Sequence, residues 1–345
     1  MKAFFSDDQL LHDPQQYMRV GRICKPADLP TRAEALMGTL AARGITVTAP
    51  PEAGREALEL VHAPDYLDYL ETAFERWQQI ESFGLQPGIE VLPNMSPHGP
   101  REGACPSPAM LAQTGWYVGD LSCPIGPHTW RSVLRSAHAA LAAAETVRDA
   151  GGVAYALCRP SGHHAQRARA AGFCYVNNSA IAAATLRQTH ARVAVLDIDA
   201  HHGDGTQQIF YARGDVLTIS THADPASYYP WYTGYAHERG TGEGEGCNLN
   251  LPLAHGSGNA EFAQALDAAT AAIERFAPQA LVLPLGFDTY RDDPISVLKF
   301  DMDAFRLAGA RVRALGLPTV VVQEGGYMVG AIGAALDAFL EGLRP

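Results

Sequence analysis

Short apolar runs and segments with helical spacing alternate along the second half of the chain. The runs, rich in β-branched residues, predict buried strands at 152–157, 191–197, 216–220, 280–285 and 319–322. The segments with helical spacing predict helices at 177–188, 205–211, 257–276, 303–315 and 330–340. Strands and helices that alternate in this way form right-handed crossovers. The pattern therefore predicts an α/β fold with a mostly parallel sheet and helices on both faces.

The first half of the chain has a different pattern. Helical spacing predicts helices at 31–43, 55–82 and 130–150, but the stretch 84–128 is rich in Pro and Gly and has weak periodicity. A long irregular segment inside a compact chain usually has a function of its own. Because no repeat or linker divides the sequence, we expect one domain over 1–345 with 84–128 as a long insertion.

Composition and charge narrow the class of protein. The chain has 345 residues, of which 47% are hydrophobic, and this is enough to bury a large core. Its net charge of −11 gives no reason to expect a nucleic-acid partner. No apolar run approaches the roughly 20 residues of a membrane span, and the charged start MKAFFSDDQLLHD does not resemble a signal peptide. The six cysteines are scattered without a C-x-x-C pair, so we expect reduced thiols and a cytoplasmic protein without a membrane partner.

Side chains of catalytic type follow every predicted strand of the second half. In parallel sheets the ligand site lies outside the carboxyl ends of the strands. In chain order, these ends carry His163 and His164; Asp197, Asp199 and His201; Ser220 and His222; Asp288; and Tyr327. Residues two apart in an extended strand end point the same way, so Asp199 and His201 can face one cation. Carboxylate and imidazole are the ligands of a zinc-class ion where thiolate is absent.

The motifs that contain these residues resemble a known family. They are RPSGHHA, GFCYVNN, DIDAHHGDGTQQIFY, STHADP, GFDTYRDDPIS and EGGY, in this order. Together they resemble the histone deacetylase superfamily, and in particular its bacterial acetylpolyamine amidohydrolases. FFSDDQLLH and VHAPDYLDYLETAFERW resemble the family too, so the resemblance covers essentially the whole chain. It implies the single-domain arginase/deacetylase-like fold and a zinc-dependent deacetylase.

The resemblance also implies the ion sites. The implied zinc ligands are Asp199, His201 and Asp288, and three protein ligands leave one position for water. Two carboxylates and one imidazole suit zinc and iron(II) alike. Many relatives hold a structural potassium ion nearby, for which the matching residues are Asp197, Asp199, His201, Ser220 and Thr221. Arginase-type enzymes need further carboxylates for a second metal, but this chain has Gly203 and Tyr290 at those positions, which favours one catalytic metal.

The remaining implied roles concern proton transfer. His164 would be the main general acid–base, and His163 would assist it electrostatically. The carboxylates that would orient the two rings are Asp197 and Asp204. Tyr327 would donate its hydroxyl to the oxyanion that forms during hydrolysis.

Substrate selectivity is expected to depend on the channel walls and the insertion. Gly172, Phe173 and Tyr229 match the walls of a narrow channel for an acylated amine. The insertion at 84–128 would narrow the entrance and form a homodimer. Polyamine enzymes carry an acidic residue where this chain has Leu111, and leucine cannot pair with a distal ammonium group. The carboxylates that could replace it are Glu90, Glu102 and Asp120.

The sequence therefore leaves three candidate functions open. The first is deacetylation of a small acetylated amine such as an acetylpolyamine. The second keeps the chemistry but uses an acyl-lysine peptide or another N-acyl amine. The third, a non-catalytic acyl-lysine binder, is disfavoured because the ligand, base and tyrosine positions are all intact. Two other histidines near these motifs, His202 and His222, are expected to have structural roles. Asp293 is expected to fix the loop that contains it, and Arg159 is expected to be a loop anchor or a substrate contact.

Overall fold

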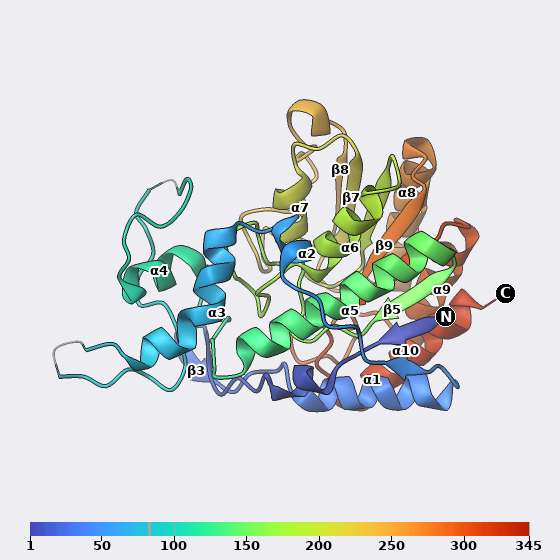
Figure 1. The fold of residues 1–345 in the computed structure, drawn as a ribbon. Helices are drawn as coiled ribbons and strands as arrows, with labels where there is room; N and C mark the ends of the chain where they lie inside the picture. The colour runs from blue at the N-terminus through green and yellow to red at the C-terminus, as the bar shows by residue number, and fades with distance from the viewer. Residues whose placement is uncertain (82–83, 100, 345) are drawn as a thin grey trace.

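An eight-stranded parallel sheet forms the centre of the molecule. The computed structural model describes residues 1–81, 84–99 and 101–344. The strand order is β4-β1-β5-β10-β9-β6-β7-β8, and all pairs are parallel. The strands are β1 (Lys2–Phe4), β4 (Val47–Thr48), β5 (Val153–Ala156), β6 (Val193–Asp197), β7 (Val216–Ala223), β8 (Asn248–Leu253), β9 (Ala280–Leu285) and β10 (Thr319–Gln323). This architecture confirms the predicted fold class (Figure 1).

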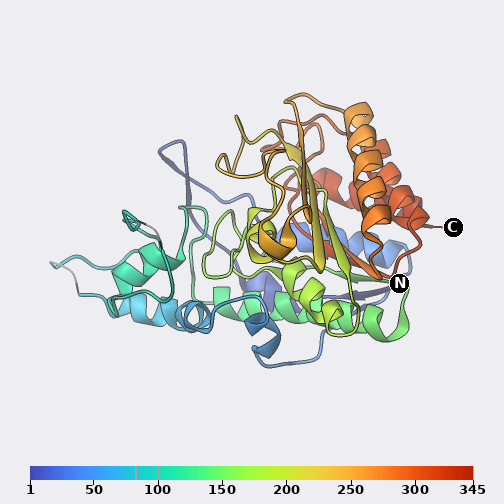
Figure 2. The same cartoon turned by 90° about the horizontal axis from the view of Figure 1, so that it is seen from above.

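Helices cover both faces of the sheet. One face packs against α1 (Pro30–Ala42), α8 (Asn259–Phe276), α9 (Met302–Ala314) and α10 (Val329–Leu343). The other packs against α5 (Thr129–Ala150) and α6 (Asn178–Arg187), as Figure 2 shows from above. Successive strand residues point to opposite faces, so Val322 joins the cluster beneath α5 and Val321 joins the other cluster. Burial on both faces explains why the central strands are continuous apolar runs.

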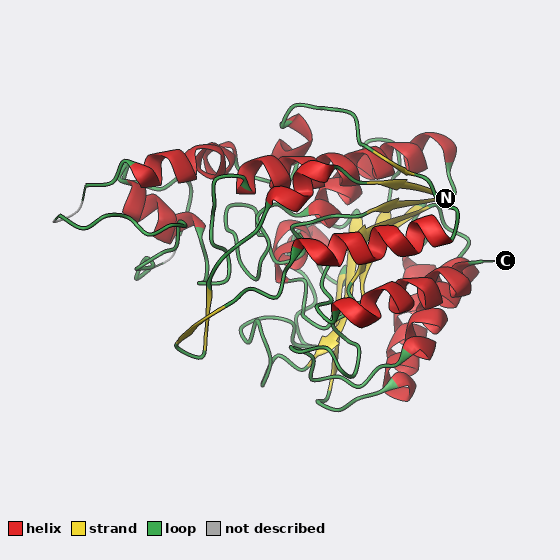
Figure 3. Cartoon of the chain, turned by 90° about the horizontal axis from the view of Figure 1, so that it is seen from below, coloured by secondary structure: helices red, strands yellow, loops and turns green. Residues whose placement is uncertain are grey.

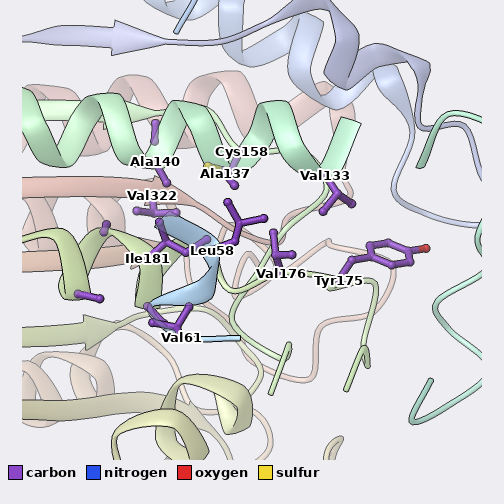
Figure 4. Close-up of a cluster of buried hydrophobic side chains, with 14 of the residues drawn as sticks. Leu58, Val61, Val133, Ala137, Ala140, Cys158, Tyr175, Val176, Ile181 and Val322 are labelled. Carbon is purple, nitrogen blue, oxygen red and sulfur yellow. The ribbon is translucent and has the colours of Figure 1, made fainter. Parts of the chain in front are cut away.

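The core beneath α5 combines small and large side chains. Figure 4 shows alanines of α5 above Ile181 of α6 and Val322 of β10, with the ring of Tyr175 at the edge of the cluster. Ala137 and Ala140 are fully buried, and their small size lets α5 lie close to the sheet. The alanine content that predicted a strong helix at 130–150 is therefore also what allows this close packing.

Elements that the sequence did not predict are short or interrupted. β1 and β4 are too short to leave a pattern, and β8, with the sequence NLNLPL, contains polar residues and a proline. The helix predicted at 55–82 was wrong as one element, because it consists of α2 (Glu56–Glu59) and α3 (Pro64–Gln78). Pro64 occupies the first turn of α3, which is a favoured proline position. Position 82 lies outside the described residues.

The insertion has structure of its own in its described part. It contains α4 (Met110–Tyr117), which packs against α3, and an isolated bridge joins Val91 to Ile125. α3, α4 and the neighbouring loops project beyond the end of the sheet as an arm (Figures 1 and 3). An antiparallel hairpin of β2 (Tyr17–Arg19) and β3 (Arg22–Cys24) projects nearby. In the part of the chain that is described, no helix combines the length and apolar character that a membrane crossing requires.

Candidate active site

Five neighbouring strands deliver the candidate residues to one edge of the sheet. β5, β10, β9, β6 and β7 are consecutive in the sheet although their order along the chain differs. Their carboxyl ends surround a cavity of about 670 Å³. Of the predicted residues, those that line it are Asp120, His163, His164, Gly172, Phe173, His201, Tyr229 and Tyr327. Side chains from positions far apart in the sequence therefore line the same cavity.

Asp199, His201 and Asp288 form a compact buried cluster. One possible ligand atom from each lies within 4.8 Å of the other two. Nδ1 of His201 is 3.1 Å from Oδ1 of Asp199 and 3.0 Å from Oδ2 of Asp288. The second oxygen of each carboxylate is held by a backbone amide, because Gly325 N donates to Asp199 (2.9 Å) and Ala200 N donates to Asp288 (2.9 Å).

The donor set of this cluster fits a divalent cation. Burial raises the pKa of Asp288 to about 7, and the neighbouring Asp199 carboxylate acts in the same direction. Two buried carboxylates this close to each other are costly unless positive charge lies between them. A cation bound by Asp199, His201 and Asp288 would supply that charge, and two carboxylate oxygens with one imidazole nitrogen suit zinc or iron(II).

The paired histidines each hydrogen-bond to a carboxylate through Nδ1. His163 lies 2.9 Å from Oδ2 of Asp197, and His164 lies 2.6 Å from Oδ1 of Asp204. Their ring centroids are 4.1 Å apart. Asn177 caps α6 and donates its side-chain amide to the carbonyls of His163 (3.4 Å) and Ala165 (3.1 Å), which fixes the loop between β5 and α6. Nε2 of His163 lies 3.8 Å from Oδ1 of Asp199, so this ring stands between two carboxylates.

The surroundings give the two rings opposite tendencies to hold a proton. Burial acts to lower the pKa of His163, but the Asp197 and Asp199 carboxylates outweigh it and raise this pKa well above its usual value. For His164, burial and then the neighbouring rings of His163 and His201 lower the pKa well below its usual value. Pairs of groups whose pKa values are pushed apart mark the acid and base roles of an active site.

Gly172, Phe173 and Tyr229 form the walls beside His164. Gly172 has a φ of +56°, and a Cβ atom there would lie 2.4 Å from Cδ2 of His164, so the position requires glycine. Phe173 also has a positive φ of 68°, which directs its ring toward Tyr327 at a centroid distance of 5.9 Å. The Tyr229 ring meets the His164 ring edge to face at 5.0 Å.

Tyr327 is held through its backbone and its ring. Oδ2 of Asp293 accepts hydrogen bonds from the amides of Tyr327 (2.6 Å) and Met328 (3.0 Å). The guanidinium carbon of Arg32 lies 4.7 Å from the centre of the Tyr327 ring. Gly326, at a φ of +119°, approaches Phe287 so closely that a Cβ would lie 2.7 Å from the Phe287 Cβ. The loop after β10 is therefore packed tightly enough to fix the direction of the tyrosine.

The residues matched to a potassium site lie at the end of β6 and in the bend that follows it, and at Ser220 and Thr221 within β7. Asp197 is opposite Ser220 in the register of these strands. The hydroxyl of Thr221 donates to the Asp197 carbonyl (3.5 Å), while Oγ of Ser220 lies 2.8 Å from Nδ1 of His222. Nε2 of His222 contacts the carbonyl of Gly234 at 2.8 Å, so both nitrogens of this ring have protein partners.

The structure separates other candidates from the cavity. Leu111 lies in α4, half-buried against the core, and is outside the described lining of the cavity. His202 points to Thr233 (3.2 Å) and Gln207 (3.1 Å). Arg159 is fully buried and pairs with Asp28 (3.0 Å), as expected of a loop anchor.

Sequence reasoning missed three supporting residues. Oε2 of Glu324 accepts hydrogen bonds from the amides of Gly162 (2.7 Å) and His163 (3.2 Å), which ties the loop after β10 to the paired histidines. Its place directly before two glycines at a strand end was a usable signal. The ring of Tyr228 stacks on His201 at 4.7 Å. The role of Arg32, far away in α1, had no local signal.

The parallel sheet, the carboxylate–histidine cluster and the paired histidines define a metal-dependent hydrolase. The family model of the histone deacetylase domain matches residues 26–343, and the chain belongs to this family. Both the predicted family and the predicted class of hydrolytic deacetylase are confirmed.

Relatives match the chain over its full length. An acetylpolyamine amidohydrolase of Burkholderia pseudomallei (strain 1710b) is 47% identical over 342 residues, which are 99% of this chain and 98% of the relative. One of Mycoplana ramosa is 36% identical over 345 residues, 99% of each chain. The crystal structure of acetylpolyamine aminohydrolase from Burkholderia pseudomallei, an iodide soak, matches with a TM-score of 0.95 at 47% identity, covering 99% of this chain and 98% of that one.

Proposed function

We propose that this chain is a metal-dependent amidohydrolase that removes the acetyl group from a small acetylated amine such as an acetylpolyamine. The observation that carries the proposal is the meeting of the Asp199–His201–Asp288 cluster, the paired histidines and Tyr327 around one cavity. Full-length similarity to acetylpolyamine amidohydrolases supports the substrate class. Asp199, His201 and Asp288 would hold the ion, zinc or iron(II), which when bound acidifies water and polarises the amide carbonyl.

In the proposed reaction His164 moves the proton. Its lowered pKa keeps the imidazole neutral, so it can accept a proton from the attacking water and then deliver it to the leaving amine nitrogen. Asp204 holds Nδ1 of this ring and thereby directs Nε2 to the substrate. The products are acetate and the free amine, so water supplies both the new C–O bond and the proton on nitrogen.

His163 and Tyr327 would stabilise the negative charge that develops on the carbonyl oxygen. The raised pKa of His163 favours a positive ring beside the reacting centre, and Asp197 holds that ring in place. Burial keeps the pKa of Tyr327 well above its usual value although Arg32 acts against it, so its hydroxyl stays a hydrogen-bond donor. Phe173 and Tyr229 would guide a slender chain past Gly172.

Three further assignments belong to this proposal. A structural potassium ion would be held by Asp197, Asp199, His201, Ser220 and Thr221, and the pairing of Asp197 with Ser220 across β6 and β7 supports this. The 84–128 insertion would form the entrance and a homodimer contact, supported by its projection from the body of the molecule. All six cysteines are free, which supports a working place in the reducing cytoplasm.

Turnover measurements test the proposal directly. The purified protein is stripped with a chelator, reloaded with zinc or iron(II), and assayed on N-acetylputrescine, N-acetylcadaverine and an acetyl-lysine peptide. We expect no turnover without metal and a strong preference for the two small amines after reloading. Preference for the peptide would favour the lysine deacetylase alternative, and the absence of turnover on all three substrates with metal bound would contradict the enzyme assignment.

A further inference from the structure

The β2–β3 hairpin carries two neighbouring positive charges at the edge of the cavity. Its turn consists of Val20 and Gly21, whose φ values of 50° and 71° are both positive, as a two-residue hairpin turn requires. Arg19 and Arg22 flank this turn and are opposite each other in the antiparallel register, so their side chains lie on the same face. Like charges placed opposite each other are destabilising, and an anion bound beside them would relieve this repulsion.

Arg19 is the member of this pair that lines the cavity. Among the described lining residues, it is the one whose side chain carries a permanent positive charge. Both arginines are exposed, and in the described part of the chain neither forms an ion pair with a carboxylate. Burial raises the pKa of Tyr228, and nearby carboxylates add to this effect, whereas the charge of Arg19 opposes it. The guanidinium group therefore lies near the Tyr228 phenol, which is also part of the lining.

Tyr228 connects Arg19 to the reacting end of the cavity. The Tyr228 ring stacks on the imidazole of His201, with the ring centroids 4.7 Å apart. Its hydroxyl donates a hydrogen bond to the carbonyl of Ile295, which holds the phenol at the cavity wall. The distance between Arg19 and His201 is therefore set mainly by the Tyr228 side chain. An acetylated amino acid with the chain length of lysine can span this separation.

The carboxylate of the cavity lining lies beside other residues. Among the described lining residues it belongs to Asp120, whose Oδ2 accepts hydrogen bonds from the Tyr229 hydroxyl (2.8 Å) and from Gly172 N (3.0 Å). This carboxylate also acts on Arg169, whose pKa is lowered by burial and raised by the charge of Asp120. The charge of Asp120 is thus balanced by Arg169, and the charge of Arg19 stays available to a ligand.

We propose that Arg19 binds a carboxylate at the far end of the substrate, so that the enzyme hydrolyses ω-N-acetylated amino acids such as Nε-acetyllysine beside acetylated diamines. The inference rests on the function proposed above and adds a second class of substrate to the same site. A guanidinium group can donate two parallel hydrogen bonds to a carboxylate, and Arg22 adds positive charge beside it. The cavity of about 670 Å³ has room for more than a slender chain. Hydrolysis consumes water and releases acetate and the free amino acid.

Two substrates that differ only in the carboxylate test this proposal. Nε-acetyllysine is N-acetylcadaverine with a carboxylate added to the carbon that bears the free amino group. The metal-loaded wild type should hydrolyse both. Arg19→Gln removes the positive charge but keeps a polar side chain, and steady-state kinetics compares the two substrates. We expect the ratio of their kcat/KM values to shift about 10-fold against Nε-acetyllysine, mainly through a higher KM, as the loss of one charge-assisted hydrogen bond at a partly exposed site predicts.

Two further variants control this result. Lys25→Gln removes the same charge from an exposed position just after β3, outside the described lining of the cavity, and should leave the ratio unchanged. Arg22→Gln should shift the ratio in the same direction as Arg19→Gln but less, because Arg22 is not part of that lining. A larger shift in Arg22→Gln than in Arg19→Gln would overturn the assignment to Arg19.

The remaining outcomes separate this inference from the proposed function. An unchanged ratio in Arg19→Gln, with or without an equal loss on both substrates, would mean that Arg19 does not bind the carboxylate, and the inference would be wrong. A wild type that hydrolyses N-acetylcadaverine but not Nε-acetyllysine would overturn it too, while leaving the amidohydrolase assignment intact. Turnover of neither substrate with metal bound would contradict the proposed function itself.

Discussion

Tyr327 offers the sharpest residue-level test of the proposed chemistry. Tyr327→Phe removes only the hydroxyl and keeps the ring, so the ring contacts with Phe173 and Arg32 should remain. If the hydroxyl stabilises the developing oxyanion, kcat should fall about 10²- to 10³-fold with little change in KM. Steady-state kinetics on N-acetylcadaverine checks this, and thermal unfolding serves as the control for packing. A variant with normal kcat would remove Tyr327 from the mechanism.

Substitutions of His164 and His201 should have different effects on metal content and on activity. His164→Ala removes the proposed base but leaves the Asp199–His201–Asp288 cluster, so we expect a loss of about 10²- to 10⁴-fold in kcat with bound metal retained. His201→Ala removes the imidazole of the cluster, and both metal content and activity should fall. Metal analysis by mass spectrometry beside the activity assay distinguishes the two. Loss of metal in His164→Ala would place that ring among the ligands instead.

A residue of the site can be predicted from the sequence when the residues next to it in the chain form a recognisable pattern. Asp199 and His201 could be predicted as a pair from the D-x-H pattern just after an apolar strand. The structure places both in the bend that follows β6 rather than in an extended strand end, and there they join Asp288 in one cluster. Asp120 is different. The sequence offered it as one of three candidate carboxylates, but its contacts with Gly172 and Tyr229, 52 and 109 residues along the chain, leave no local pattern. Long-range hydrogen bonds of this kind became visible only in three dimensions.

At the level of elements, α1 supports the catalytic loop that follows β10. Arg32 of α1 donates to the carbonyls of Glu324 (2.8 Å) and Gly326 (2.5 Å). It also pairs with the buried Asp28 at 2.6 Å, and Arg159 pairs with the same oxygen at 3.0 Å. One guanidinium therefore fixes both sides of the backbone turn that precedes Tyr327.

Removing this guanidinium should destabilise the protein and disturb the loop. Arg32→Ala leaves Asp28 buried with one of its two arginine partners, and it removes the donor to the Gly326 carbonyl, while Gln323 still donates to the Glu324 carbonyl. We therefore expect a loss of about 3–5 kcal/mol in the free energy of unfolding. Arg43→Ala is the matched control: it removes an arginine just after α1 whose partner, Asp337, is exposed, and should cost about 0–1 kcal/mol. Chemical denaturation measures both. Equal losses of unfolding free energy in the two variants would show that the buried Arg32–Asp28 pair stabilises the protein no more than the exposed pair does.

Helices and strands could be predicted where burial gives the segment a clear hydrophobic pattern, and they were missed where it does not. The strands β5, β6, β9 and β10 are buried on both faces and could be predicted as apolar runs. β8 lies at the edge of the sheet, where its side chains alternate between buried and partly exposed, and its asparagines join a polar network with Gln207. α4 in the insertion was not predicted either, because its glycine and two aromatic residues give little helical signal.

On the scale of the whole molecule, the catalytic edge of the sheet faces the arm formed by α3, α4 and the insertion. The arm projects beyond the compact body, so part of its surface has no contact with the sheet (Figure 1). The insertion exposes large apolar side chains, with Leu85 72%, Ile89 67% and Met95 57% accessible. Exposed apolar groups gathered on one segment are typical of a protein–protein interface. This distribution supports the proposed homodimer through the insertion.

Sedimentation velocity can test which surface forms that dimer. Replacing Leu85 and Ile89 by Asp places two charges where apolar contacts are proposed, and we expect the dissociation constant to rise about 100-fold or more, because central apolar contacts each contribute about 2 kcal/mol. Ile23→Asp is the matched control, since Ile23 is 73% exposed but lies on the β2–β3 hairpin outside the insertion. The control should stay dimeric. Dissociation by Ile23→Asp alone would assign the interface to the hairpin, and a monomeric wild type would contradict the homodimer altogether.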